Sequence, residues 1–156
     1  MRKRKNWLIA IVVLLLGMQF IRIDKTNPPV DASVDYIALT NPPEDVIQML
    51  RSACYDCHSH ETQYPWYSNV APVSWMLGNH IREGRKHLNF STMGNLPVKV
   101  FAHKMEEAQE EVLEKKMPMK SYTFAHSDSK LTDEQRKRLA QWFADSTPDA
   151  SIEEED

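Results

Sequence analysis

The sequence contains little glycine and little cysteine, and each shortage argues against a class of protein. Only four glycines occur in 156 residues, and none forms a glycine-rich phosphate-binding loop. The two cysteines, Cys54 and Cys57, are too few for a disulfide framework. No internal repeat and no Ser/His/Asp nucleophile pattern occurs. The sequence therefore gives no indication of a phosphate-binding loop, a hydrolase triad or a disulfide-rich fold.

Positive charge is scarce beyond the N-terminal segment. Residues 1–23 carry five of the 19 Lys and Arg residues and no acid, which leaves 14 bases against 22 acids from Asp24 onward. A domain with this net charge of −8 does not suit nucleic acid, so no nucleic-acid partner is expected. An acidic surface would suit a basic docking partner.

The longest apolar run lies near the N-terminus, over residues 7–23, and follows four basic residues. Its length is close to the minimum of about 17 residues for a transmembrane helix. We therefore predict a cytoplasmic basic tail over 1–6, a single-pass signal anchor over 7–23 in the bacterial inner membrane, and the remainder in the periplasm. A cleaved signal peptide is the alternative, but the residues after the run lack the small side chains that cleavage requires. No cysteine follows the run closely, which excludes a lipoprotein signal.

The middle of the chain has helical periodicity. Residues 24–40 are polar and contain Pro28 and Pro29, which predicts an extended tether. Asn41 is expected to cap a first helix that ends at the cysteines, and a second is expected over about 72–87.

The third and fourth predicted helices complete the domain. The third begins near Pro97 and ends before Met117 and Pro118, and the fourth is capped by Thr132 with Gln135 in the capping-box position. We expect an all-α fold of about four helices over 41–145. A disordered acidic tail is expected over 146–156.

The two cysteines belong to the stretch Cys54-Tyr55-Asp56-Cys57-His58, which has the Cys-x-x-Cys-His pattern of c-type haem attachment. The thiols of Cys54 and Cys57 can add to the two vinyl groups of one porphyrin. His58 then lies under the iron as its proximal ligand. This attachment takes place on the outer side of the inner membrane, in agreement with the topology predicted from other residues.

Other sites that use Cys-x-x-Cys remain as alternatives. A thioredoxin-like redox pair does not require the following histidine and lies near a strand-helix-strand pattern, which is missing here. A zinc site needs about four ligands, which His60 or His80 would have to complete. A disulfide across two residues would stabilise little. His60 is too close in sequence to His58 to reach the opposite face of a haem, and a surface position is expected.

Several residues after the motif are candidates for haem contacts. Trp66 and Tyr67 have polar tips and apolar rings that can cover a porphyrin. His80 lies on the apolar stripe of the second helix, where it is a distal ligand, a propionate partner or a core residue. Arg82 and Arg85 can bind propionates, and the alternative for each is a solvated position.

Met117 is the main candidate for the sixth iron ligand. Because Pro118 disfavours helix at the preceding residue, Met117 is expected in a loop that can present its thioether to iron. Met119 is a weaker candidate, and simple packing is the alternative for both methionines.

Several short blocks of this sequence resemble a known family, the small bacterial haem-binding domain proteins with one Cys-x-x-Cys-His, which are similar in pattern to monohaem c-type cytochromes. The resemblance covers about residues 35–145 and depends on residues 54–62, 64–67, 72–75, 80–85, 88–91 and 117–122, with the final helix at 139–142. It implies a mainly helical domain with one haem c, in which Cys54 and Cys57 form the thioether links and His58 is the proximal ligand. The order of elements in small cytochromes favours Met117 as sixth ligand; His80 and an open site are the alternatives.

These observations predict a membrane-anchored monohaem protein that carries single electrons between redox protein partners, whose identity the sequence does not disclose. An electron carrier is expected rather than an enzyme, because the iron itself changes oxidation state and no substrate pocket is needed. The alternative is a haem-based sensor or a peroxidase-like protein with an open distal position.

Overall fold

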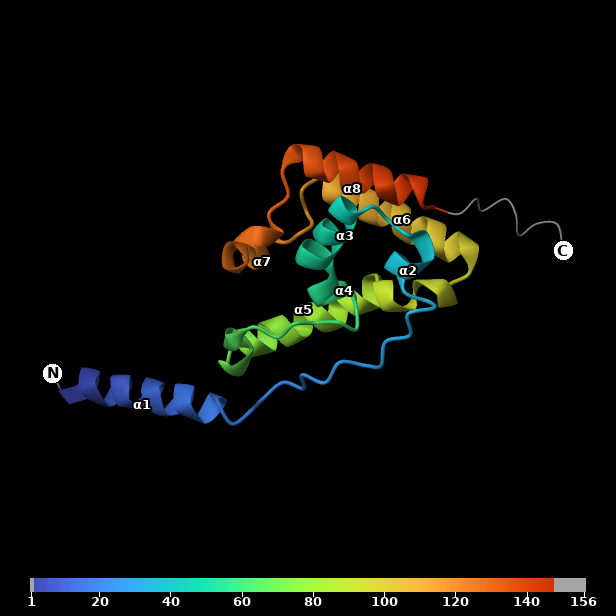
Figure 1. Cartoon of the computed structure of the whole chain (residues 1–156). Coiled ribbons are helices and arrows are strands. Elements are labelled where there is room, and N and C mark those ends of the chain that lie inside the picture. Colours follow the sequence, from blue (N-terminus) through green and yellow to red (C-terminus); the bar gives the residue numbers. More distant parts are fainter. Residues whose placement is uncertain (1, 148–156) are drawn as a thin grey trace.

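The computed structural model describes residues 2–147, and every regular element in that range is a helix or a helical turn (Figure 1). This confirms the all-α class. The α-helices are α1 (Arg2–Met18), α2 (Tyr36–Thr40), α3 (Glu44–Leu50), α4 (Asp56–His58), α5 (Val73–His87), α6 (Val98–Leu113), α7 (Lys120–Ala125) and α8 (Asp133–Asp145). The π-helical turn is η1 (Arg51–Tyr55), and the 3₁₀ turns are η2 (Trp66–Asn69), η3 (Phe90–Asn95) and η4 (Ser127–Ser129).

Three of the predicted helices lie close to their expected positions. The second corresponds to α5, the third to α6 and the fourth to α8. The capping box of α8 is formed as predicted: the Gln135 amide donates to Thr132 Oγ1 at 3.2 Å, and the Thr132 amide donates to Gln135 Oε1 at 2.8 Å. Local sequence therefore determines where this helix begins.

Asn41 does not cap the helix that follows it, contrary to the prediction. It ends α2 in the left-handed conformation, with φ 46°, and its amide donates to the Ile37 carbonyl at 2.9 Å. Asparagine tolerates this conformation better than most residues. The next helix, α3, begins after Pro43 without a side-chain cap.

The short helix α2 lies in the segment that was expected to be an extended tether. Asp35 caps it by accepting from the Ile37 amide at 3.0 Å. Tyr36 is fully buried, and burial raises the pKa of its hydroxyl to about 12. The end of the presumed tether is thus part of the domain.

The N-terminal helix α1 (Arg2–Met18) begins and ends five residues earlier than the predicted span of 7–23. Gln19 then binds the backbone of Ala71: its Nε2 donates to the Ala71 carbonyl and its Oε1 accepts from the Ala71 amide, both at 3.0 Å. Across residues 2–147 we find no helix with the length and apolar content that crossing a bilayer requires. The predicted transmembrane helix over 7–23 is therefore not supported.

The main core lies where α3, α6 and α8 meet, with α2 and η3 at its edge (Figure 1). Its largest fully buried apolar side chains are Tyr36, Phe90, Phe143, Leu50, Met93, Met105, Leu139 and Val46. The helix α5 packs against α4 rather than into this core. Residues 148–156 of the predicted acidic tail lie outside the described residues.

Candidate haem site

The described residues enclose a cavity of about 520 Å³. Its walls come from η1 and α4, from α5, from α6, and from the segment between α6 and α7. The three residues of the Cys-x-x-Cys-His pattern, Cys54, Cys57 and His58, all line it. Typical ligand pockets measure about 300–1,000 Å³, so the cavity has the size of a cofactor site.

The local helix geometry carries both cysteines to this cavity. Cys54 lies in the π-helical turn η1 and Cys57 in the following helix α4. A π turn inserts an extra residue into a helix and often marks a functional site. Tyr55, between the two cysteines, is buried and stacks on Phe90 with ring centroids 5.3 Å apart and planes 3° apart. The motif therefore packs on the core through the Tyr55 side chain.

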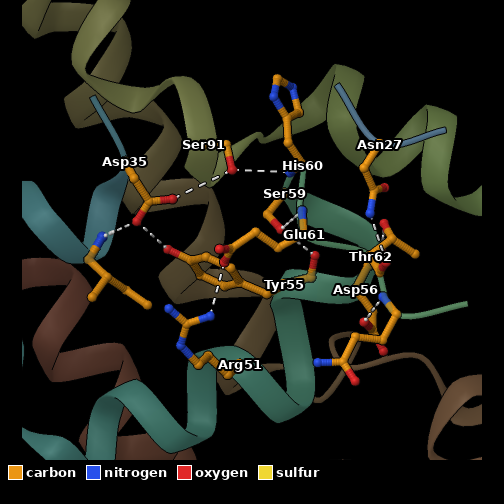
Figure 2. A network of polar contacts seen from close by, with 12 residues as sticks. Asn27, Asp35, Arg51, Tyr55, Asp56, Ser59, His60, Glu61, Thr62 and Ser91 are labelled. Atoms are coloured by element: carbon orange, nitrogen blue, oxygen red, sulfur yellow. Dashed lines mark hydrogen bonds and ion pairs between the residues drawn. The ribbon is translucent and has the colours of Figure 1, made fainter. Parts of the chain in front are cut away.

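A polar network holds the motif and the residues after it (Figure 2). Asp35 Oδ1 accepts from the Tyr55 hydroxyl at 3.0 Å, and burial, with the nearby Asp35 carboxylate, raises the pKa of Tyr55. Ser91 Oγ accepts from the His60 amide at 3.0 Å and lies 3.5 Å from Asp35 Oδ2. Ser59 Oγ donates to the Tyr55 carbonyl at 2.7 Å. These bonds connect the motif to α2 and η3.

The helices α4 and α5 approach each other closely at Gly84. A β-carbon at this position would lie 2.7 Å from the Cys57 carbonyl oxygen. Such a contact is too short for any side chain larger than hydrogen, so glycine permits the packing of α5 on the motif.

The ring of His58 has a defined orientation and protonation state. Its Nδ1 lies 3.0 Å from the Leu88 carbonyl, and because a carbonyl only accepts, Nδ1 carries the proton. Burial lowers the pKa of the ring, which favours the neutral form. Nε2 is then the nitrogen with the free lone pair. A ring whose Nδ1 proton is held by a backbone carbonyl, with Nε2 left free, is typical of metal-binding histidines.

Both cysteines are free thiols and are partly buried. Burial, with a smaller effect of Cys57, raises the pKa of Cys54 to about 12. Burial, with the charge of Asp56, raises that of Cys57 to about 11. A thioredoxin-like pair needs a lowered thiol pKa, so the redox alternative is disfavoured. Within residues 2–147 no group of three or more His, Cys, Asp or Glu side chains lies in an arrangement that could hold a metal ion.

The structure brings the predicted sixth-ligand candidates into the same cavity. Met117, Met119 and His80 all line it, from the segment after α6 and from α5. Arg136 holds the methionine segment, because its Nη1 donates to the carbonyls of Val112 at 3.0 Å and Met117 at 2.5 Å. Which side chain binds iron stays a prediction.

Four other predicted haem contacts do not line the cavity. Trp66 is 78% exposed, and the Tyr67 hydroxyl lies 2.8 Å from His126 Nε2. Arg82 is exposed beside Asn79. Arg85 instead donates to the Ser59 carbonyl at 2.7 Å and also binds Asn27 and Thr62. Arg85 thus supports the segment that follows the motif.

His60 also lies away from the cavity lining, as expected from its proximity to His58. Its ring Nδ1 donates to the Pro29 carbonyl at 2.9 Å, and its Nε2 faces the Asn89 amide. His60 therefore joins the N-terminal segment to η3.

Sequence analysis did not identify Lys104, His87, Phe90 and Tyr122 as cavity residues. Lys104 is the one Lys or Arg side chain among the described residues of the lining. Its position follows from helical spacing, because it lies one turn before Ala108, which belongs to the apolar stripe of α6. Tyr122 is held by a bond from its hydroxyl to Asp56 Oδ2 at 2.7 Å.

Comparison with known proteins gives one family. The profile of the haem-binding domain family matches residues 13–145, most of the chain. Searches of curated proteins and of solved structures found no match.

Proposed function

This chain belongs to the haem-binding domain family, and from that premise we propose that it is a monohaem c-type protein that transfers single electrons on the outer face of the bacterial inner membrane. Haem binding follows from the family. We propose three further properties of this chain: covalent attachment of the haem, electron transfer and a location at the membrane.

One observation supports the proposal of covalent haem attachment. The three residues of the Cys-x-x-Cys-His pattern line one cavity of cofactor size. Cys54 and Cys57 would form the two thioether links, and His58 would bind iron through Nε2 while Leu88 holds Nδ1. The cavity also contains Phe90, a flat apolar surface suited to a porphyrin.

The opposite coordination position would be filled by Met117. Its thioether is soft and uncharged, and its segment is held by Arg136. Lys104 lines the cavity, where its Nζ donates to Glu107 Oε2 at 2.9 Å, and it would exchange this partner for a haem propionate. This is the role first assigned to Arg82 and Arg85, which lie outside the lining. Bound haem supplies one-electron chemistry, and the protein supplies its attachment, ligation and apolar surroundings.

Membrane attachment would come from α1. Its apolar side chains are exposed, among them Trp7 at 74% and Leu14 at 64%, and basic residues begin the helix. Such a helix can insert apolar side chains at the membrane surface while its basic residues attract anionic lipid. The electron partners are proposed to be redox proteins, for which the net acidic domain suits a basic docking face.

The first test is the mass and spectrum of the chain made with c-haem maturation. We expect one covalently added haem and low-spin spectra in both oxidation states. The double variant Cys54→Ala/Cys57→Ala should lose the mass gain. A colourless, unmodified wild-type protein would overturn the proposal.

The second test concerns the sixth ligand. Met117→Ala should remove the near-infrared band of methionine-ligated ferric haem and lower the reduction potential, whereas the matched variant Met119→Ala should keep both. If Met117→Ala leaves the spectrum unchanged and His80→Ala alters it, His80 is the ligand. A five-coordinate high-spin spectrum in the wild type, with rapid carbon monoxide binding, would instead favour a sensor or peroxidase-like function.

A further inference from the structure

The region around the start of α5 exposes apolar side chains that the haem site does not use. Trp66 in η2 is 78% exposed and Met76 in α5 is 60% exposed, with Val70 and Val73 exposed between them. Val73 and Met76 are three residues apart on a helix and therefore share a face. We call Trp66, Val70, Val73 and Met76 the η2–α5 patch.

The patch adjoins the end of α1, where further apolar residues are exposed. Phe20 is 89% exposed and Ile21 is 64% exposed. The Trp75 indole donates to the Ile21 carbonyl at 2.8 Å, and Gln19 exchanges two hydrogen bonds with the backbone of Ala71. The segment after α1 is thus hydrogen-bonded to Ala71 and Trp75, which are sequence neighbours of the patch residues.

The arrangement of the elements agrees with these contacts. α1 leaves the domain at the end where α5 begins (Figure 1). The junction is further held by Lys25 Nζ, which donates to Asn69 Oδ1 at 2.6 Å, and by Ile23, which lies against Gly78. These contacts fix the C-terminal end of α1 beside the elements that carry the η2–α5 patch.

We propose that the η2–α5 patch is a second membrane contact, which lies in the lipid interface beside α1 and sets the orientation of the haem domain. The inference rests on the proposed attachment of α1 to the membrane. It adds that the folded domain itself touches lipid.

Lipid suits this surface better than a protein partner. The patch lies near the end of α1, whose exposed side chains are apolar along its length beyond the basic start. Tryptophan is enriched at the interface between lipid and water. Arg22 and Lys25, which follow the apolar residues, provide positive charge at the level of anionic headgroups.

The proposal places the haem site near the membrane. α5 begins in the patch at Val73 and lines the cavity from His80 onward. At 1.5 Å of rise per residue, the two positions are separated by about 10 Å along the helix. The cavity would then lie on the part of α5 next to the proposed membrane contact.

Site-specific photocrosslinking in the full-length, haem-loaded chain tests the proposal. The photoreactive residue p-benzoylphenylalanine replaces Trp66 or Met76 in the patch, Leu14 in α1, or Leu39 in α2. Each variant is reconstituted with vesicles of phosphatidylethanolamine and phosphatidylglycerol, irradiated, and analysed by intact mass. Leu39 is the matched control, because it is apolar and 46% exposed but lies away from α1. An unchanged haem spectrum shows that each variant is folded.

We expect several-fold more lipid adduct at positions 66 and 76 than at position 39. Adduct at position 14 with only control levels at 66 and 76 would overturn the membrane contact of the patch and leave the attachment of α1 intact. No adduct at any position would overturn both. Adducts at 66 or 76 between two copies of the chain, in place of lipid, would show a self-association surface and also overturn the proposal.

Discussion

At the scale of single residues, two arginines of α5 that have similar sequence surroundings differ in their contacts. Arg85 binds the Ser59 carbonyl, Asn27 Oδ1 and Thr62 Oγ1. Arg82 is exposed and binds the neighbouring side chain of Asn79. The guanidinium of Arg85 matches three acceptors from two segments, which a smaller group could not bridge.

We predict that Arg85→Gln destabilises the haem-loaded chain by about 1–3 kcal/mol, because buried acceptors lose hydrogen bonds from a charged donor. Arg82→Gln should change the stability by less than about 0.5 kcal/mol. Urea unfolding monitored by circular dichroism measures both. Equal stability of the two variants would contradict the role of Arg85.

His58 makes the stability of the haem-free chain depend on pH. Burial lowers its pKa below the usual 6.5, so the folded chain takes up this proton less readily than the unfolded chain. The free energy of unfolding is therefore highest above pH 6.5 and falls as the pH decreases from 6.5 toward the lowered pKa.

The corresponding measurement is urea unfolding of the haem-free chain at about pH 8 and about pH 5. The loss of stability at the lower pH should be smaller in His58→Gln than in the wild type. His103→Gln is the control for an exposed histidine, because that side chain is 64% exposed and lies 3.4 Å from Glu107, and it should change the pH dependence less than His58→Gln does. A His58→Gln chain with the full wild-type loss would contradict the prediction.

At the scale of elements, the haem site depends on how closely α5 packs on α4. The position of Gly84 against the Cys57 carbonyl sets this distance, and His58 is joined to the end of α5 through Leu88. A change in the spacing of the two helices therefore moves a cysteine and the histidine together.

We predict that Gly84→Ala destabilises the chain by about 1–3 kcal/mol, because the new methyl group overlaps the Cys57 carbonyl and α5 must shift. The haem spectrum should change in the same variant. Gly17→Ala is the control, since a β-carbon there meets no atom within 4 Å. Denaturant midpoints and absorption spectra of the two variants check the prediction, and identical behaviour would contradict it.

At the scale of the whole molecule, the cavity lies between parts of the chain that are far apart in sequence. The motif, α5, α6 and the segment after α6 each contribute one wall. Without a bound group these walls lack part of their apolar contacts, so haem is expected to contribute to the stability of the domain.

We therefore predict that the haem-free Cys54→Ala/Cys57→Ala chain has a lower Tm than the haem-loaded wild type by at least about 5 °C. In a chain of this length each kcal/mol of stability changes Tm by about 2–4 °C. Differential scanning calorimetry measures the difference. Equal values of Tm would show that the cavity walls are stable without the cofactor.

Local patterns explain which predictions agreed with the structure. The capping box of Thr132 and the apolar stripes of α5 and α6 act within one or two helical turns, so the helices lie where expected. Asn41 was assigned to the wrong helix because asparagine suits both an N-cap and a left-handed C-cap. The helix over 7–23 was predicted from hydropathy alone, which contains no information on the contact between Gln19 and Ala71.

The sequence by itself determined the all-helical class, the candidate attachment residues Cys54, Cys57 and His58, and the methionine segment as a source of a further ligand, because these depend on residue type and short spacing. Only the tertiary structure decided that Met117 and His80 share a cavity with the motif, that Lys104 lines it, and that Arg82 and Arg85 do not. The reason is physical: whether a side chain reaches a cavity depends on helix packing across long separations in the chain, as at Gly84 and Cys57, which no local pattern specifies.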